Sequence, residues 1–235
     1  MNNSRTKAIG HFYVLLDRLS RLQSWPKTLA ACSGRDKWPM RGVYFFQESG
    51  EERRESGSGP RIVRVGTHAL TTSSRTSVWK RLSQHKGAIN TGGGNHRGSI
   101  FRLLVGTALV AKNNLAYPTW GQGGTAPRST RDAELPLEIL VSHRIRSMPF
   151  LCLPIGDAPG PDSLRGYIEQ NSIALLSNFN RSPVDSPSSN WLGHHCPRGK
   201  VRNSGLWNQR HVDQEPAPEF LDRLEQFISD AEAQI

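Results

Sequence analysis

The sequence predicts a mixed α+β fold, because strand-like and helical apolar patterns both occur along the chain. Strands are predicted at residues 41–46 and 61–65, on either side of a polar loop, and at residues 149–155. Helices are predicted where apolar residues recur at helical spacing: residues 6–25, 78–85, 163–176 and 218–233. A length of 235 residues is long for one small domain and short for two, so we expect one globular domain with insertions.

The first predicted helix is amphipathic. Its apolar face is made of Phe12, Leu15, Leu16, Leu19 and Leu22. Pro26 ends the pattern, because a proline cannot continue a helix. Such a face most simply packs against a sheet, and contact with DNA or with a partner is the alternative.

The chain is strongly basic. It carries a formal charge of +10, and 23 of its 30 basic residues are arginine. Arginine makes planar, bidentate contacts with phosphate, and dense negative charge attracts basic proteins. The charge therefore favours a nucleic-acid partner, although a high-GC genome would also enrich arginine. The apolar residues, 36% of the chain, together with the glycines suffice for a globular core and argue against disorder of the whole.

The cysteines Cys32, Cys152 and Cys196 are far apart and odd in number. They form neither a disulfide framework nor a zinc spacing, so a reducing cytoplasm is expected. His194 and His195 precede Cys196 without the usual ligand spacing, which favours a loop over a zinc site. The N-terminus lacks the apolar core of a signal peptide, and no apolar run is long enough for a membrane helix.

The strand at residues 61–65 places one arginine among apolar residues. Ile62 and Arg64 should share one face of this strand. Val63 and Val65 should share the other. The preceding segment, residues 47–60, is charged and glycine-rich without periodicity, which predicts a long exposed loop.

The helix at residues 78–85 has clear ends. It follows a Ser/Thr-rich link that ends in good N-cap residues, and Gly87 is a typical C-terminal glycine. Its apolar stripe consists of Val78, Trp79 and Leu82. Arg81 and His85 lie within about 40° of each other beside this stripe. They are either held at the margin of the core, where an active site would need them, or are ordinary surface residues.

Residues 92–99, GGGNHRGS, form a polar glycine loop. Closely spaced backbone amides, together with His96 and Arg97, could receive a phosphate at this loop. The alternative of equal weight is a flexible turn. The loop is therefore a candidate nucleic-acid contact.

The segments around this loop carry less information. The apolar run at residues 100–105 predicts a strand, and a helix is predicted at residues 135–146, beginning near Pro136. Residues 112–131 lack periodicity and predict a surface excursion that carries specificity or is simply mobile. Residues 183–189 are rich in turn-forming residues.

Glu169 is the unusual residue of the helix at residues 163–176. Ile173 follows it at i+4 and Leu176 at i+7, so its carboxylate is expected to project among apolar neighbours. A carboxylate on a buried side must be neutralised, paired with a base or bound to a metal. Glu169 is therefore a candidate functional residue.

The predicted hairpin resembles the signature of the GIY-YIG nuclease superfamily. GVY at residues 42–44 stands in the place of GIY, and RVG at residues 64–66 stands in the place of YIG. The order that follows is also similar to the family, with Arg81 on a helix and Glu169 on a later helix. His85, one helical turn after Arg81, is similar to the restriction-endonuclease branch, which has a histidine at that relative position.

An asparagine completes the resemblance, which spans roughly residues 41–180. Asn180 best matches the family's aromatic-then-asparagine ending, and Asn178 is the alternative. Arg64 departs from the pattern, because the family usually has a tyrosine there. Some nucleases of the restriction branch are similar in having a basic residue at this position.

The resemblance implies a small central antiparallel sheet flanked by helices. It divides the chain into a helical extension at residues 1–40, a nuclease core with inserted loops at residues 41–182, and a C-terminal segment. That segment, residues 183–235, comprises a loop region and a packing helix. These boundaries are expectations from the resemblance.

The resemblance also implies an activity. It implies an endonuclease that hydrolyses DNA with Mg²⁺ (or Mn²⁺), in a restriction-like or genome-defence role. DNA is the expected partner, and no membrane contact is expected. A homodimer would be needed for a double-strand cut, because one active site of this kind cuts one strand.

Each candidate residue has a chemical role in such a reaction. Glu169 suits a hard cation that retains most of its waters. Arg81, whose guanidinium keeps its charge, suits the phosphate oxygens, and Arg64 is expected to contact phosphate as well. The resemblance implies that Tyr44 orients or deprotonates the water, and His85 could take the proton instead.

Two other classes of protein fit the same sequence. In the first, the domain binds nucleic acid without cutting it, and Arg64 marks the loss of the chemistry. Such a protein would bind DNA in a salt-sensitive way, indifferent to metal and to Glu169. In the second, the chain is a structural or interaction protein with neither property.

Overall fold

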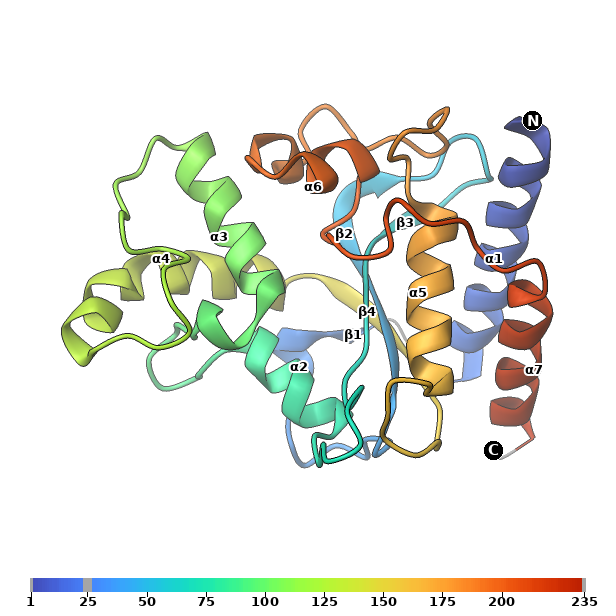
Figure 1. Ribbon diagram of the computed structural model, residues 1–235, viewed down its shortest axis with the longest axis horizontal. Coiled ribbons are helices and arrows are strands. Elements are labelled where there is room, and N and C mark those ends of the chain that lie inside the picture. The colour runs from blue at the N-terminus through green and yellow to red at the C-terminus, as the bar shows by residue number, and fades with distance from the viewer. Residues whose placement is uncertain (1, 23–26, 234–235) are drawn as a thin grey trace.

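The computed structural model describes residues 2–22 and 27–233, which form a four-stranded antiparallel sheet with helices on both faces (Figure 1). The strands are β1 (Lys27–Thr28), β2 (Gly42–Glu52), β3 (Pro60–Gly66) and β4 (Pro149–Pro154). Their order is β1-β4-β2-β3, so β2 lies inside the sheet and β3 at its edge. The predicted mixed α+β fold, with a small antiparallel sheet flanked by helices, is confirmed.

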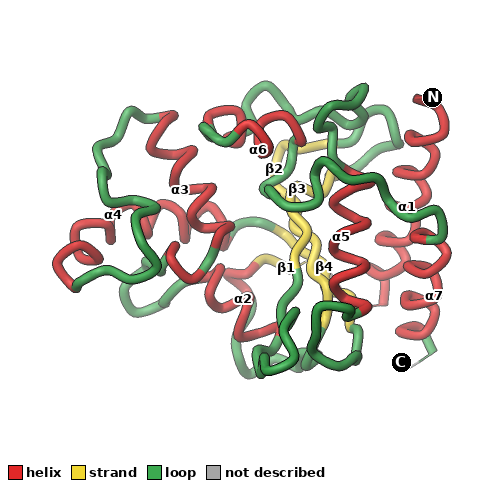
Figure 2. Tube along the Cα trace, viewed as in Figure 1, coloured by secondary structure: helices red, strands yellow, loops and turns green. Residues whose placement is uncertain are grey.

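The described helices pack in two layers, one on each face of the sheet (Figure 2). The first layer contains α1 (Asn2–Leu22), α5 (Leu164–Leu176) and α7 (Phe220–Glu232). The second contains α2 (Val78–Lys86), α3 (Ile100–Lys112), α4 (Arg128–Arg146) and α6 (Gly199–Ser204). Along β2, Val43 and Phe45 join the first core, whereas Tyr44 and Phe46 join the second. Tyr44 therefore faces the layer that contains α2.

Helices α1 and α7 lie side by side in the first layer (Figure 1). Phe12 of α1 is buried against Phe45 of β2, with ring centroids 5.9 Å apart. Arg18 of α1 pairs with Glu232 of α7 at 2.8 Å. The apolar face of the N-terminal helix thus packs against the sheet, and positions 23–25 of that predicted helix lie outside the described residues.

Strand β2 is longer than the sequence predicted. The predicted exposed loop at residues 47–60 is wrong in its first part, because β2 continues to Glu52 and only residues 53–59 connect the strands. The charged residues of this segment predicted exposure to solvent, but Glu48 and Glu51 are buried. Glu48 accepts hydrogen bonds from two indole N–H groups, and Glu51 pairs with Arg61 at 2.6 Å. Buried partners therefore allow a charged sequence to form a strand.

A β-bulge in β3 overturns the predicted alternation of that strand. The register with β2 shifts at Val63, which is an extra residue between Ile62 and Arg64. Ile62 and Val65 consequently lie in the first core, whereas Val63 lies in the second. Arg64 turns toward the second layer, where its guanidinium carbon lies 5.0 Å from the ring centroid of Phe101. The bulge therefore places Arg64 on the same side of the sheet as Tyr44.

The predicted ends of α2 and α5 are confirmed. Ser77 caps α2 by accepting the backbone N–H of Lys80 at 3.2 Å. Gly87 follows the last turn of α2 with a φ of 76°, a conformation that favours glycine. Ser163 caps α5 in the same way, by accepting the N–H of Gly166. Local sequence signals therefore define the two helices that carry the candidate residues.

The prediction of a strand at residues 100–105 is wrong, because this run forms the first half of α3. Ser99 caps the helix by accepting the backbone N–H of Arg102 at 3.3 Å. The apolar residues of α3 that are fully buried are Phe101, Leu104, Val105 and Ala108. A short apolar run that is buried on several sides has no helical stripe, and periodicity alone then cannot separate a helix from a strand.

Helix α4 begins earlier than predicted. It starts at Arg128, within the predicted surface excursion, so Pro136 lies inside the helix and not near its start. A proline inside a helix removes one backbone hydrogen bond, so its presence at a helix start was the simpler expectation. Tertiary contacts outweigh this preference, because Glu134 and Glu138 on either side of Pro136 make buried ion pairs.

None of the described helices has the length and apolar character that crossing a membrane requires. Cys32, Cys152 and Cys196 are free and buried. His194 and His195 lie in a short 3₁₀ turn, Leu192–His195. The described part of the chain contains no group of three or more side chains that could hold a metal ion on their own.

Candidate active site

A cavity of about 450 Å³ lies at the end of β3 and collects several of the predicted site residues. Arg64, Thr67, Arg81 and Glu169 line it, from β3, the residue after β3, α2 and α5. Its other lining residues are Leu70, Ile100, Ile173, Asn208, Gln209, Arg210 and His211. Among the described residues of this lining, Glu169 is the only carboxylate, against the three arginines Arg64, Arg81 and Arg210. The cavity is therefore positively charged and suits an anionic ligand such as phosphate.

Tyr44 and His85 form a buried pair beside this cavity. The Tyr44 hydroxyl lies 3.0 Å from His85 Nε2 and 3.4 Å from the carbonyl oxygen of Thr67. His85 Nδ1 lies 2.7 Å from Ser99 Oγ, which also accepts the N–H of Arg102. Ser99 Oγ has a second lone pair that can accept from Nδ1, and we assign the ring proton to Nδ1 because this tautomer lets the hydroxyl of Tyr44 donate to Nε2. Nε2 is then free to accept the hydroxyl proton of Tyr44.

Burial and nearby positive charge set the protonation states of this pair. The pKa of His85 lies well below its usual value of 6.5, first because of burial and then because of three nearby arginines. Burial also raises the pKa of Tyr44, and Arg81 and Arg64 oppose that rise. At neutral pH, His85 is therefore a neutral base and Tyr44 holds its proton.

Arg64 presents a buried guanidinium to the cavity. Its Nη1 donates to the carbonyl oxygen of Trp207, and its Nε has no hydrogen-bond partner in the described structure. Burial lowers the pKa of Arg64, whereas Tyr44 and Glu169 act in the opposite direction. An unsatisfied buried N–H carries a desolvation penalty of about 1–3 kcal/mol, which a bound anion would relieve.

Arg81 links the cavity to the Tyr44–His85 pair. It is half-buried, and its Nη1 donates to Gln84 Oε1 and to the carbonyl oxygen of Gly98, each at 2.9 Å. The charge of Arg81 also lowers the pKa of Tyr44 against the effect of burial. Arg81 therefore belongs both to the cavity wall and to the surroundings of Tyr44.

Glu169 projects from α5 into the cavity and is half-buried. Its Oε1 accepts the backbone N–H of Thr67 at 3.2 Å. Burial raises the pKa of Glu169 above the usual range, and the nearby charge of Arg64 opposes this rise most. No ion pair of Glu169 occurs among the described residues, so the expected need for neutralisation is not met by a salt bridge.

This carboxylate fits a hard cation. Mg²⁺ keeps several waters and is commonly held by one or two carboxylates together with substrate phosphates. A cavity of about 450 Å³ has room for a hydrated ion beside Glu169. The anionic form of Glu169 is disfavoured by burial, so a bound cation would offset that cost.

Two glycines of the hairpin are required by close contacts. A Cβ on Gly42 would lie 2.4 Å from the carbonyl oxygen of Leu153 on the neighbouring strand β4. Gly66 pairs with Tyr44 across β2 and β3, and a Cβ there would lie 2.7 Å from the Tyr44 hydroxyl. Both distances are too short for a side chain. Gly66 in particular leaves the space that the Tyr44 ring occupies.

Replacing Gly66 with alanine is expected to lower the nuclease activity that the resemblance implies by about 10- to 100-fold, because the new methyl group displaces the Tyr44 hydroxyl by a fraction of an ångström or more. Cleavage rates of folded protein at saturating DNA measure the effect. Gly156→Ala is the matched control, since a Cβ there meets nothing within 4 Å. Equal activity of the two variants would contradict this role of Gly66.

Neither predicted asparagine lies in the cavity lining. Asn178 holds two segments together: its Oδ1 accepts from Arg5 Nη2 and from the Val184 N–H, both at 3.0 Å. Asn180 is exposed in a turn, with a φ of 55°. The prediction that one of them joins the site is corrected by this geometry, because the chain turns away from the cavity after α5.

The asparagine in the cavity is Asn208, which the sequence did not single out. Its Nδ2 donates to the carbonyl oxygen of Val65 at 2.9 Å, and its Oδ1 accepts the Val65 N–H at 3.2 Å. The N–H of Trp207 donates to the carbonyl oxygen of Val63 at 2.7 Å. This segment therefore provides hydrogen-bond partners for backbone groups at the open edge of β3. Its polar and aromatic sequence has no periodicity that could have indicated a pairing with a distant strand.

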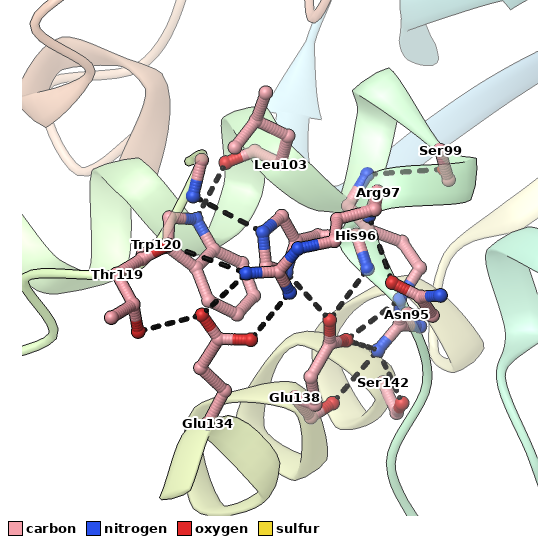
Figure 3. A network of polar contacts seen from close by, with 12 residues as sticks. Asn95, His96, Arg97, Ser99, Leu103, Thr119, Trp120, Glu134, Glu138 and Ser142 are labelled. Atoms are coloured by element: carbon pink, nitrogen blue, oxygen red, sulfur yellow. Dashed lines mark hydrogen bonds and ion pairs between the residues drawn. The ribbon is translucent and has the colours of Figure 1, made fainter. Parts of the chain in front are cut away.

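The side chains of His96 and Arg97 are paired with glutamates of α4. Figure 3 shows both side chains pointing at α4, where His96 Nδ1 lies 3.0 Å from Glu138 and Arg97 contacts both oxygens of Glu134 at 2.5 and 2.9 Å. The ring of His96 also stacks on Trp120, with centroids 3.8 Å apart. The predicted phosphate contact at this loop is therefore wrong, and so is the flexible turn, because these residues fix the loop to α4.

Replacing Arg97 with alanine is expected to lower the free energy of unfolding by roughly 3–5 kcal/mol, because it leaves Glu134 buried without its charge partner. Denaturant unfolding measures this change. Arg128→Ala is the matched control: the Arg128–Asp132 pair is exposed, and its loss should cost less than about 1 kcal/mol. A similar cost for both variants would contradict a stabilising role for the buried pair.

Comparison with known families shows what the chain is similar to. A family model described as GIY-YIG domain matches residues 3–234. No curated protein and no solved structure gave a significant match. The match includes the hairpin, the cavity and both terminal helices.

Proposed function

The chain belongs to the GIY-YIG nuclease superfamily, because the family match covers nearly its whole length, and we propose from this premise that it is a metal-dependent endonuclease that hydrolyses DNA. The observation that carries the proposal is the cavity that joins Glu169 to two arginines beside the buried Tyr44–His85 pair. Phosphodiester hydrolysis needs stabilisation of the phosphoryl charge, an activated water and help for the leaving oxygen.

The phosphate of the scissile bond is bound by Arg64 and Arg81. Arg64 offers an unsatisfied buried N–H, and Arg81 offers a half-buried guanidinium at the cavity wall. Both charges stabilise the extra negative charge that the phosphoryl oxygens gain during attack. The overall charge of +10 attracts the DNA backbone at longer range.

The attacking water loses its proton to the Tyr44–His85 pair. The hydroxyl of Tyr44 takes the proton of the water and passes its own proton to His85 Nε2. The water oxygen forms a bond to phosphorus while the bond to one ester oxygen breaks, and the leaving oxygen acquires a proton from solvent. His85 returns its proton to solvent afterwards, so the cycle is balanced.

Glu169 holds the divalent cation, Mg²⁺ or Mn²⁺. The cation, when bound, neutralises charge on the phosphoryl and leaving oxygens. The carboxylate of Glu169 is kept in place by the N–H of Thr67, the residue that follows the RVG tripeptide. Strand β3 and α5 are therefore coupled at the point where the cation binds.

Arg64 in place of the family's tyrosine is compatible with activity. It carries a positive charge close to Tyr44, which lowers the pKa of the phenol against the effect of burial. An arginine at this position therefore supports a transient phenolate, whereas a second tyrosine would act only by hydrogen bonding. The alternative, a domain that binds DNA without cutting it, is favoured only by the departure from the motif.

Metal-dependent cleavage of supercoiled plasmid tests the proposal. The purified protein is expected to nick or cut plasmid with Mg²⁺ or Mn²⁺ and to stop when EDTA is added. The binding-only alternative gives DNA affinity that falls with salt but is the same with and without metal. Absence of both cutting and binding would leave neither function standing.

Several finer points remain predictions. A restriction-like or genome-defence role, a cytoplasmic location and a homodimer for double-strand cleavage follow from the resemblance and the composition. The cavity supports the cutting of one strand, because it contains one set of candidate catalytic residues. Accumulation of nicked plasmid before linear plasmid would indicate single-strand cleavage by a monomer.

A further inference from the structure

One wall of the cavity comes from a segment that is far from β3 and α2 in the sequence. This segment has no role in the hydrolysis proposed above. Residues 207–211 follow α6 and run along the open edge of β3 (Figure 1). The hydrogen bonds of Trp207 and Asn208 to β3 fix this segment to the strand that carries Arg64. His211, at the end of the segment, is thereby held at the cavity.

The ring of His211 is oriented by a neighbour. Its Nδ1 lies 2.8 Å from Gln214 Oε1, and the Gln214 N–H donates to the carbonyl oxygen of His211. An amide oxygen only accepts, so we assign the proton to Nδ1 and the lone pair to Nε2. Nε2 has no protein partner in the described structure. Histidines that bind metals commonly have this arrangement, with the second nitrogen held by an acceptor.

The backbone of His211 also sets this geometry. Its φ of 63° lies in the left-handed region, which non-glycine residues adopt infrequently. The hydrogen bonds of Gln214 hold the residue there. Such conformations are maintained where the surrounding structure enforces them, and they are frequent at ligand sites.

Glu169 and His211 line the same cavity, one from α5 and the other from the segment that runs along β3. Arg64, Arg81 and Arg210 line the same cavity and repel a cation. A single carboxylate in this setting is a weak cation site, whereas a neutral nitrogen donor beside it adds binding without adding repulsion.

From this geometry we propose that Glu169 and His211 together ligate the divalent cation, and that the oxygen–nitrogen pair makes the site prefer a first-row transition ion to Mg²⁺. The inference rests on the proposed function, because it concerns the same cation. Mg²⁺ strongly prefers oxygen ligands, whereas first-row transition ions accept imidazole readily. Mn²⁺ should therefore bind more tightly than Mg²⁺.

Direct Mn²⁺ binding to the 235-residue chain tests this inference. Electron paramagnetic resonance titrations give the Mn²⁺ affinity, and electron spin-echo modulation detects a directly bound ¹⁴N nucleus. His211→Asn is the test variant, because asparagine tolerates the left-handed backbone of this position. It should weaken Mn²⁺ binding about tenfold or more and abolish the nitrogen signal, while competition should show Mg²⁺ binding changed by less than about threefold.

His195→Ala is the matched control, since His195 is exposed outside the cavity, and it should bind Mn²⁺ like the wild type. Gln214→Ala should weaken Mn²⁺ binding by less than His211→Asn, because it only frees the ring. Circular dichroism confirms that each variant is folded. An unchanged Mn²⁺ affinity and nitrogen signal in His211→Asn, or no Mn²⁺ binding to the wild type with or without duplex DNA, would overturn the inference.

Plasmid cleavage with Mg²⁺, measured on the same samples, separates this inference from the proposed function. If the wild type cuts DNA and His211→Asn keeps both cleavage and Mn²⁺ affinity, the proposal that His211 is a metal ligand is wrong and the proposed nuclease function is retained. If the wild type does not cut DNA while Mn²⁺ binding depends on Glu169 and His211, the proposed nuclease function is wrong and the proposed cation site is retained.

Discussion

Replacing Glu169 with glutamine is expected to lower the rate of DNA cleavage by roughly 10³-fold, which corresponds to about 4 kcal/mol of transition-state stabilisation. Glutamine keeps the shape of the side chain and can still accept the N–H of Thr67, but it lacks the negative charge that the proposed cation needs. Single-turnover cleavage of labelled duplex DNA measures the loss.

Folding and DNA binding should survive this change. The carboxylate is half-buried with a raised pKa, so a neutral side chain removes a charge that burial disfavours. Gln170→Ala on the exposed side of α5 is the matched control and should cut DNA normally. Cleavage by Glu169→Gln at the wild-type rate would contradict the role given to this carboxylate.

Tyr44 and His85 are expected to act as one unit. Tyr44→Phe and His85→Gln should each lower the cleavage rate by roughly 10²–10³-fold, because either change breaks the path of the proton from the water to Nε2. The double variant should be little worse than either single variant, since the second change has nothing left to remove. Single-turnover rates of the three variants give the coupling.

A second buried tyrosine provides the control for this pair. Tyr13 lies on the opposite face of the sheet, where its hydroxyl accepts the N–H of Ile62 at 2.8 Å. Tyr13→Phe should lower stability through the lost hydrogen bond and leave the cleavage rate of folded protein unchanged. Additive losses in the Tyr44 and His85 variants, or full activity in the double variant, would show that the two side chains do not share a proton.

The parts of the site that the sequence predicted are those set by local structure. Arg81 and His85 were expected side by side because they are four residues apart on a capped helix, either at the margin of the core or on the ordinary surface. Arg81 lines the cavity, and His85 is buried beside it. Glu169 was expected on a partly buried side of its helix, and it lines the cavity. Helical periodicity carries this information without knowledge of the rest of the fold.

Long-range pairing explains what the sequence did not predict. His96 and Arg97 resembled a phosphate loop because their partners, Glu138 and Glu134, come from a helix about forty residues later. Asn208 enters the cavity through an edge pairing with Val65, 143 residues away in the chain. Neither contact leaves a local pattern, since hydrogen bonds between distant segments depend on the complete fold.

The bulge at Val63 is another feature that left no local pattern, and it changed the direction of the Arg64 side chain. Strict alternation placed Arg64 and Ile62 on one face, whereas the extra residue separates them and turns Arg64 toward Tyr44. Bulges often occur beside active sites because they change the direction of one side chain. The departure of Arg64 from the motif and the bulge beside it therefore affect the same cavity.

Addition of Mg²⁺ to a preformed complex of the wild-type protein with labelled duplex DNA in EDTA tests the central claim most directly. Binding is followed by fluorescence anisotropy and strand scission on a denaturing gel, in the same sample. The account predicts DNA that is bound but intact before excess Mg²⁺ is added, and scission afterwards. DNA that stays bound and intact after addition of Mg²⁺ or Mn²⁺ would contradict it and favour a domain that binds nucleic acid without cutting it.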